Sequence, residues 1–167
     1  MLQRAFQYLF MLGLLSACGF HLRGMYDMPS WLNDVAIIIQ NGHRDLETLL
    51  QDQFSAYHIR TIREPSQARY WLIIEQDNEE QHITSVSSST TSRQYQMTYT
   101  VRYKLQEAQG RDVIPSCQIA VTRQLTLNSD RILGSDDEEN ILKKEMRRDA
   151  VTQILDRISH QAHQNVS

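Results

Sequence analysis

The most constraining feature of this chain is a two-residue alternation that runs through residues 94–105. Apolar side chains occupy every second position, and amide, hydroxyl or basic side chains occupy the others. Successive side chains of a β-strand point to opposite faces, so the pattern predicts one long strand with one face on a core and the other in a polar environment. The apolar positions are Tyr95, Met97, Tyr99, Val101, Tyr103 and Leu105, and the polar ones are Gln94, Gln96, Thr98, Thr100, Arg102 and Lys104.

Three further segments have the composition of strands. Residues 35–39 and 70–74 are continuous apolar runs typical of buried strands, and the second run has room to continue toward Ile83. Residues 119–127 return to an alternating pattern. The stretch 84–92 is almost entirely serine and threonine, too polar for a core, and it predicts the tip of a hairpin.

Two helices complete the chain. The first is predicted from about Arg44 to Tyr57, where leucines and aromatic residues recur at helical spacing. The second has a capping-box start at Ser135 and Glu138. Its buried stripe consists of Leu142, Met146, Ala150, Val151, Ile154, Leu155 and Ile158.

The order of these elements is β-α-β-β-β-α. A strand, helix, strand order permits a parallel pair at the start, and the later strands follow one another through turns. The sequence therefore predicts an α+β fold with two layers, in which two helices cover one face of a mixed four-stranded sheet.

The N-terminus has the form of a secretory signal. Arg4 precedes a short apolar run that ends in Leu15-Ser16-Ala17-Cys18, a pattern that looks like a bacterial lipobox. We expect residues 1–17 to be a lipoprotein signal peptide and Cys18 to be the lipid anchor; the alternative is an ordinary signal peptide with an incidental cysteine. Residues 18–34 would form a lipidated tether, residues 35–160 a single α+β domain, and residues 161–167 a flexible tail.

Composition narrows the classes of function. The chain has 17 basic and 20 acidic residues, a formal net charge of −3, which argues against a nucleic-acid-binding protein. No nucleophile–base or metal-ligand constellation stands out, so we expect no enzymatic activity, no cofactor and no metal site. His160 and His163 have a ligand-like spacing but suit a solvated helix end. Cys117 is left without a partner, and a small buried side chain is the interpretation we favour.

Two patterns leave a choice between structure and binding. Lys143, Lys144, Arg147 and Arg148 belong to the last helix, where they either form a solvated face paired with Glu139 and Glu145 or contact an anionic partner. Tyr95, Tyr99 and Tyr103 either pack under a helix or line a cleft for a small amphipathic ligand.

The chain also resembles a known family. Residues 18–24, Cys-Gly-Phe-His-Leu-Arg-Gly, look like the mature start of the lipopolysaccharide-assembly lipoprotein family LptE. Similar strings recur at residues 94–97, 110–115 and 138–146, in the family's order. The resemblance implies an outer-membrane lipoprotein that plugs the β-barrel LptD, helps it to assemble, and serves lipopolysaccharide delivery to the outer leaflet. Gly19 fits the outer membrane by the same analogy.

The family resemblance also suggests where contacts with lipopolysaccharide or the barrel would lie. Some members carry basic residues at the hairpin tip and just before the last helix. This chain has Ser88 and Ser135 at those places, with Arg93 and Arg131 close by. The departure favours a plug and assembly role over direct transfer of the glycolipid.

Overall fold

One mixed sheet of four strands, in the order β1-β2-β3-β4, organises the molecule. The computed structural model describes residues 28–86, 92–128 and 132–164. Strand β1 (Val35–Ile39) pairs in parallel with β2 (Tyr70–Val86), and β3 (Ser92–Glu107) and β4 (Asp112–Asn128) extend the sheet through antiparallel pairs. The pair is parallel because α2 (Arg44–Ala56) carries the chain back to the end of the sheet where β1 starts, so that β2 runs in the same direction as β1.

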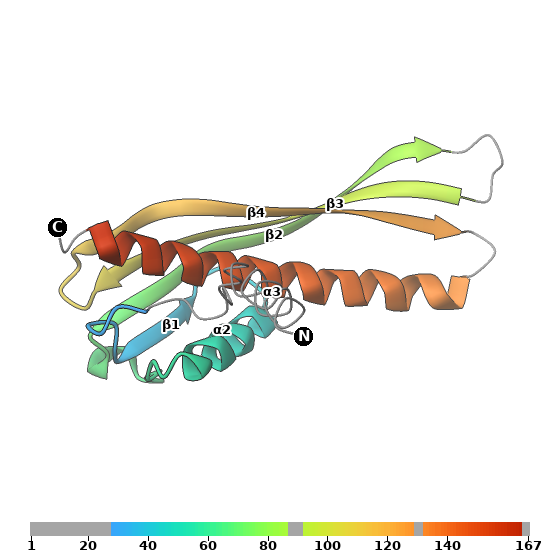
Figure 1. The fold of residues 1–167 in the computed structure, drawn as a ribbon. Helices are drawn as coiled ribbons and strands as arrows, with labels where there is room; N and C mark the ends of the chain where they lie inside the picture. Colours follow the sequence, from blue (N-terminus) through green and yellow to red (C-terminus); the bar gives the residue numbers. More distant parts are fainter. Residues whose placement is uncertain (1–27, 87–91, 129–131, 165–167) are drawn as a thin grey trace, which may run out of the picture.

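Both helices lie on one face of this sheet, as Figure 1 shows. The long helix α3 (Ile132–Gln164) runs along β3 and β4, and α2 lies beside β1 and contacts α3. Within the part of the chain that the structure describes, no helix covers the opposite face of the sheet. The predicted α+β fold, with two helices on one side of a mixed four-stranded sheet, is therefore confirmed.

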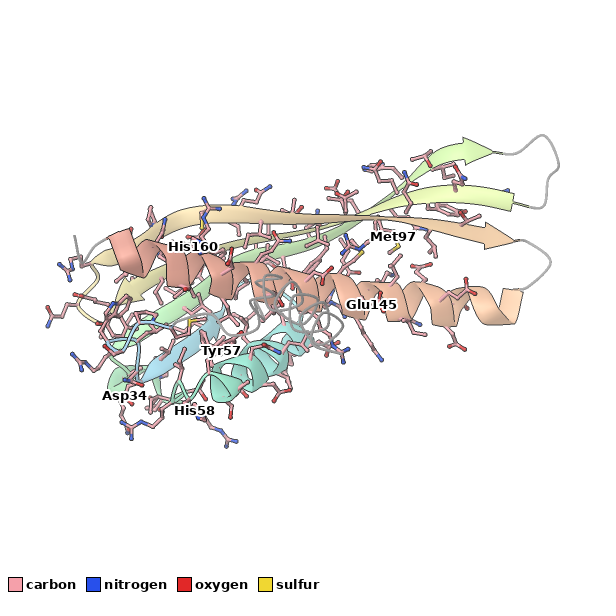
Figure 2. The ribbon with its side chains drawn as sticks, in the orientation of Figure 1. Asp34, Tyr57, His58, Met97, Glu145 and His160 are labelled. Atoms are coloured by element: carbon pink, nitrogen blue, oxygen red, sulfur yellow. The ribbon has the colours of Figure 1, made fainter. Side chains whose placement is uncertain are left out.

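The core fills the space between the sheet and the helices. The alternating residues of β3 contribute most of its large side chains, and Met97 lies on the side that faces α3 (Figure 2). Phe54, Leu50 and Leu46 of α2 pack into the same core, as their helical spacing predicts. The stripe of α3 is buried from Met146 to Ile158, and Leu142 is partly buried against it.

The start of the domain lies earlier than the sequence indicates. Residues 28–34 belong to the expected tether, yet the Leu32 side chain is only 1% exposed and Trp31 packs against Tyr70 with ring centroids 5.1 Å apart. Asp34 then turns the chain into β1 in the left-handed region, at φ 57°, a conformation that aspartate tolerates better than most residues. These residues cover the end of the core.

Two other boundaries differ from expectation. Strand β4 starts at Asp112, seven residues before the expected start at 119, because the turn at Gly110 (φ 92°) returns the chain at once to the sheet. Helix α3 starts at Ile132, so Ser135 and Glu138 lie inside the helix and do not form its capping box. Serine followed three residues later by glutamate is typical of a helix start, but α3 begins three residues before Ser135. The helix also continues to Gln164, through part of the expected tail.

A β-bulge in β2 changes which side chains face the core. The register between β2 and β3 shifts between Ile74 and Gln76. Before the shift, Leu72 and Ile74 face the helices; after it, Asp77 and Glu79 do. A bulge inserts one extra residue into a strand and so reverses the alternation that follows it.

Candidate functional site

The uncovered face of the sheet is polar along β3, β4 and the part of β2 that follows the bulge. Its side chains are mainly amides and hydroxyls, which both donate and accept hydrogen bonds. Thr98 of β3 lies opposite Thr122 of β4, with their hydroxyl oxygens 3.5 Å apart. We call it the polar sheet face; it consists of Gln76, Asn78, Glu80 and His82 of β2, the six predicted polar residues of β3, and Gln118, Ala120, Thr122, Gln124 and Thr126 of β4.

The predicted contact residues gather at one end of the molecule, as far as the structure describes them. Ser92 pairs with Asn128, and this end of the sheet lies beside the start of α3 (Figure 1). Arg93 is exposed there, between Val86 and Leu127 in the register. The backbone of Ser135 lies in the first turn of α3, at the same end.

Several predicted features fall outside the described residues. These are Ser88 at the hairpin tip, Arg131 before α3, and the whole N-terminal segment with Cys18. The signal peptide, the lipid anchor and these two contact positions stay predictions. Among the helices of the described ranges, none has both the length and the apolar character needed to cross a membrane.

A buried polar cluster around Asp77 connects α2 to the sheet. The Asp77 side chain is fully buried and accepts hydrogen bonds from the His43 backbone N–H at 3.0 Å and from the Tyr99 hydroxyl at 3.0 Å. The His43 ring Nδ1 lies 2.7 Å from the other carboxylate oxygen. Because three groups satisfy this carboxylate, it can remain buried beside the start of α2.

The residue pattern does not predict this cluster, because Asp77, Glu79 and Glu80 are typical of an exposed strand or turn. Only Glu80 is exposed; the bulge turns Asp77 and Glu79 toward the helices. The sequence shows only that acidic residues follow the apolar run 70–74 within the same strand. This pattern does not reveal a register shift.

An ion-pair network joins β2 to α3. The Arg147 guanidinium, whose side chain is only 11% exposed, donates to Glu79 at 2.5 Å and lies 3.4 Å from Asp45 of α2. Lys143 lies 2.7 Å from Glu139 and 3.8 Å from Glu79. The predicted pairing with Glu139 is therefore confirmed for Lys143, whose side chain is only 28% exposed, and the predicted outward position is wrong for Arg147, which turns inward.

The tyrosines of β3 are part of the core. Tyr99 and Tyr103 are 1% and 0% exposed, and Tyr95 packs against the core as a partly buried residue. Burial raises the pKa of the Tyr99 phenol, with the Asp77 carboxylate as a further cause, and burial beside the Cys117 thiol raises the pKa of Tyr103. Packing under a helix is thus the arrangement observed for Tyr99 and Tyr103.

The remaining chemical candidates have structural roles. Cys117 is partly buried against the core and forms no disulfide with another described residue. The His160 side chain is 69% exposed and its Nδ1 lies 2.8 Å from the Asp156 carbonyl oxygen. Within residues 28–86, 92–128 and 132–164, no cluster of three or more histidine, cysteine or acidic side chains could hold a metal ion.

The known proteins that this chain resembles, in sequence or in structure, are described as lipoproteins. LPS-assembly lipoprotein LptE of Pectobacterium atrosepticum is 24% identical over 141 residues, which cover 84% of this chain and 76% of that protein. The solution structure of lipoprotein B from Nitrosomonas europaea is 26% identical, with a TM-score of 0.69 over 84% of this chain and 90% of that one. Rare lipoprotein B from Shewanella oneidensis, 17% identical, shares the fold with a TM-score of 0.65 over 79% and 99% of the two chains.

A family-level match covers most of the domain. The family described as "LptE: Lipopolysaccharide-assembly" matches residues 32–158, from the buried Leu32 to the last core residue of α3. The match includes all four strands and α2 in full, and α3 up to Ile158. This chain therefore belongs to the LptE family of lipopolysaccharide-assembly proteins.

Proposed function

We propose that the chain is an outer-membrane lipoprotein that plugs the LptD β-barrel and helps it to assemble for lipopolysaccharide delivery. Cys18 would carry the lipid that tethers the domain to the membrane. One acyl chain binds a bilayer only marginally, at about 0.8 kcal/mol per buried methylene, so stable anchoring needs more than one chain. The domain itself would fill part of the barrel lumen.

The observation that carries this proposal is the polar sheet face. An antiparallel sheet can leave one polar face in solvent, and the interior of a membrane barrel is itself polar, so this face suits contact with a barrel wall as well as with water. Hydroxyl and amide side chains can bond to such a wall directly or through water. The face carries few charges, so its docking would require little desolvation of ions.

A structural role also suits the chemistry of the domain. The buried Asp77 is fully engaged by Tyr99 and His43, and these bonds hold α2 against the sheet. The inward-facing Glu79 is paired with Arg147. We therefore propose a non-enzymatic function, in which the polar sheet face and the end that carries Arg93 meet the partner.

Photocrosslinking in living cells tests the proposal. A photoreactive residue at Gln124, exposed on the polar sheet face, or at Ser88 should capture a large outer-membrane barrel. The matched control is Gln153, which is also an exposed glutamine but lies on α3; it should capture the barrel less efficiently. Purification in mild detergent should recover the barrel in stoichiometric amount. Recovery of an unaccompanied monomer, or capture of lipopolysaccharide alone from Gln124, would contradict the plug.

A further inference from the structure

Two basic residues of α3 remain unexplained by the fold and by the proposed partner surface. Lys144 and Arg148 are exposed and lie one helical turn apart, so their side chains share a face of the helix. Neither pairs with an acidic side chain in the part of the chain that the structure describes. Lys143 and Arg147 already have carboxylate partners, so Lys144 and Arg148 are the two unpaired basic side chains of this helix segment, next to the exposed Glu145.

These two residues line a groove between α2 and α3 with a volume of about 250 Å³. Thr48 and Leu49 line it from α2, where they add a hydroxyl group and an apolar side chain. Arg147 and Asp45 also line it and are paired with each other at 3.4 Å. Because Glu79 holds Arg147 from the other side at 2.5 Å, one wall of the groove is rigid before any ligand arrives.

We propose that this groove binds a phosphate monoester group. Such a group carries about −1.5 to −2 charges at neutral pH, which Lys144 and Arg148 together balance. The groove is smaller than the roughly 300–1,000 Å³ of pockets that enclose a whole drug-sized ligand, so it suits one charged group. Thr48 can donate a hydrogen bond to a phosphate oxygen, and Leu49 offers an apolar contact to whatever chain carries the phosphate.

The charge of the whole chain makes the site more distinctive. The protein has a formal net charge of −3, so a groove with two unpaired cations is a local reversal of sign that attracts anions. The groove lies on the helix side of the molecule, opposite the polar sheet face. The proposal therefore does not rest on the barrel partner, and its failure would leave the plug untouched.

The phosphate could be free in solution or belong to a lipid headgroup, and two probes distinguish these sources. The full chain, purified in detergent, is titrated with inorganic phosphate and with dihexanoylphosphatidic acid while ³¹P NMR reports binding. Equal affinities identify the bare phosphate as the ligand; tighter binding of the phosphatidic acid identifies a lipid headgroup. Dihexanoylphosphatidylcholine, a zwitterionic phosphodiester, should bind more weakly than either.

Matched charge variants decide whether the groove is the site. The double variant Lys144→Gln/Arg148→Gln should bind the phosphate probe about tenfold more weakly or worse, because charge-assisted hydrogen bonds are lost. Arg63→Gln/Arg157→Gln removes the same two charges from exposed positions outside both the groove and the polar sheet face and should bind as the parent does. Circular dichroism checks that both variants fold. Equal weakening in the two variants, or no binding of either probe by the parent chain, would overturn the proposal.

Discussion

The core of this fold contains two buried tyrosine hydroxyl groups, those of Tyr99 and Tyr103, which differ in their hydrogen bonding. The buried Tyr99 hydroxyl finds Asp77, whereas the Tyr103 hydroxyl has no hydrogen-bond partner among the described residues. A buried hydroxyl without a partner contributes a desolvation cost that a phenylalanine would not have. Tyr103 therefore stabilises the core through its ring, which is fully buried.

The raised pKa of Tyr103 makes stability depend on pH in the alkaline range. The unfolded tyrosine loses its proton near pH 10, whereas the folded one keeps it because burial and the nearby Cys117 thiol raise its pKa. Below pH 10 the two states are protonated alike. As the pH rises above 10, the free energy of unfolding should fall by about 1.4 kcal/mol per pH unit for this one group.

The variant Tyr103→Phe isolates that effect. At pH 8 its free energy of unfolding should match that of the parent or exceed it by up to about 1 kcal/mol, since it loses an unpaired hydroxyl. Between pH 10 and 11 the free energy of unfolding of the variant should rise relative to that of the parent, because only the parent loses stability through this group. Urea denaturation at pH 8, 10 and 11 measures both curves, and curves that stay parallel across this range would show that Tyr103 does not titrate differently in the two states.

The elements are held together by contacts that cross from helix to sheet. The bulge in β2 directs Asp77 toward the start of α2 and Glu79 toward the middle of α3. Asp77 therefore fixes the position of α2 along β2, and Glu79 fixes the position of α3 along the same strand. A straight strand would have turned both groups to the polar sheet face.

Removal of the Glu79 charge should loosen α3 from the sheet. In Glu79→Gln, the largely buried Arg147 guanidinium loses its nearer carboxylate partner and keeps only Asp45, and we expect the free energy of unfolding to fall by about 1–3 kcal/mol. Urea denaturation at neutral pH measures the change. Glu80→Gln is the control, since Glu80 is exposed on the other face and should change stability by less than about 0.5 kcal/mol. Equal effects of the two substitutions would contradict a special role for Glu79.

At the scale of the whole molecule, two separate devices would hold the protein at the membrane. The lipid predicted at Cys18 would hold it through acyl chains, and the polar sheet face would hold it through a partner. The two modes of attachment involve different parts of the chain. One would be a covalent modification of the N-terminal segment, and the other is a surface of the folded domain. Their contributions can be measured separately.

Cys18→Ser with the signal intact should abolish acylation. Without a bound partner, the substituted chain should then leave the membrane fraction, because no buried methylene groups remain to hold it. Fractionation in cells with and without the barrel, followed by a high-salt wash, measures the remaining attachment. Sedimentation of the substituted chain with membranes in both strains would mean that neither the lipid nor the barrel is what holds it.

The sequence by itself determined the order of elements, the long β3 strand and the choice of core side chains. These depend on local periodicity, which the side-chain geometry of strands and helices imposes on any chain. The polar half of β3 was likewise predicted from its alternation, and it became the centre of the candidate surface. The lipobox, too, is a linear pattern that needs no fold to be recognised.

Only the tertiary structure decided which charged residues are buried and which meet. The inward turn of Asp77 and Glu79 depends on a register shift between β2 and β3. The hydrophobic faces of both strands and their turn set the register together, so the residues of β2 alone do not reveal the shift. The groove joins Thr48 of α2 to Arg148 of α3, which are far apart in the chain and become neighbours when both helices pack on one face of the sheet. Local periodicity predicts each surface separately, whereas packing determines which surfaces face one another.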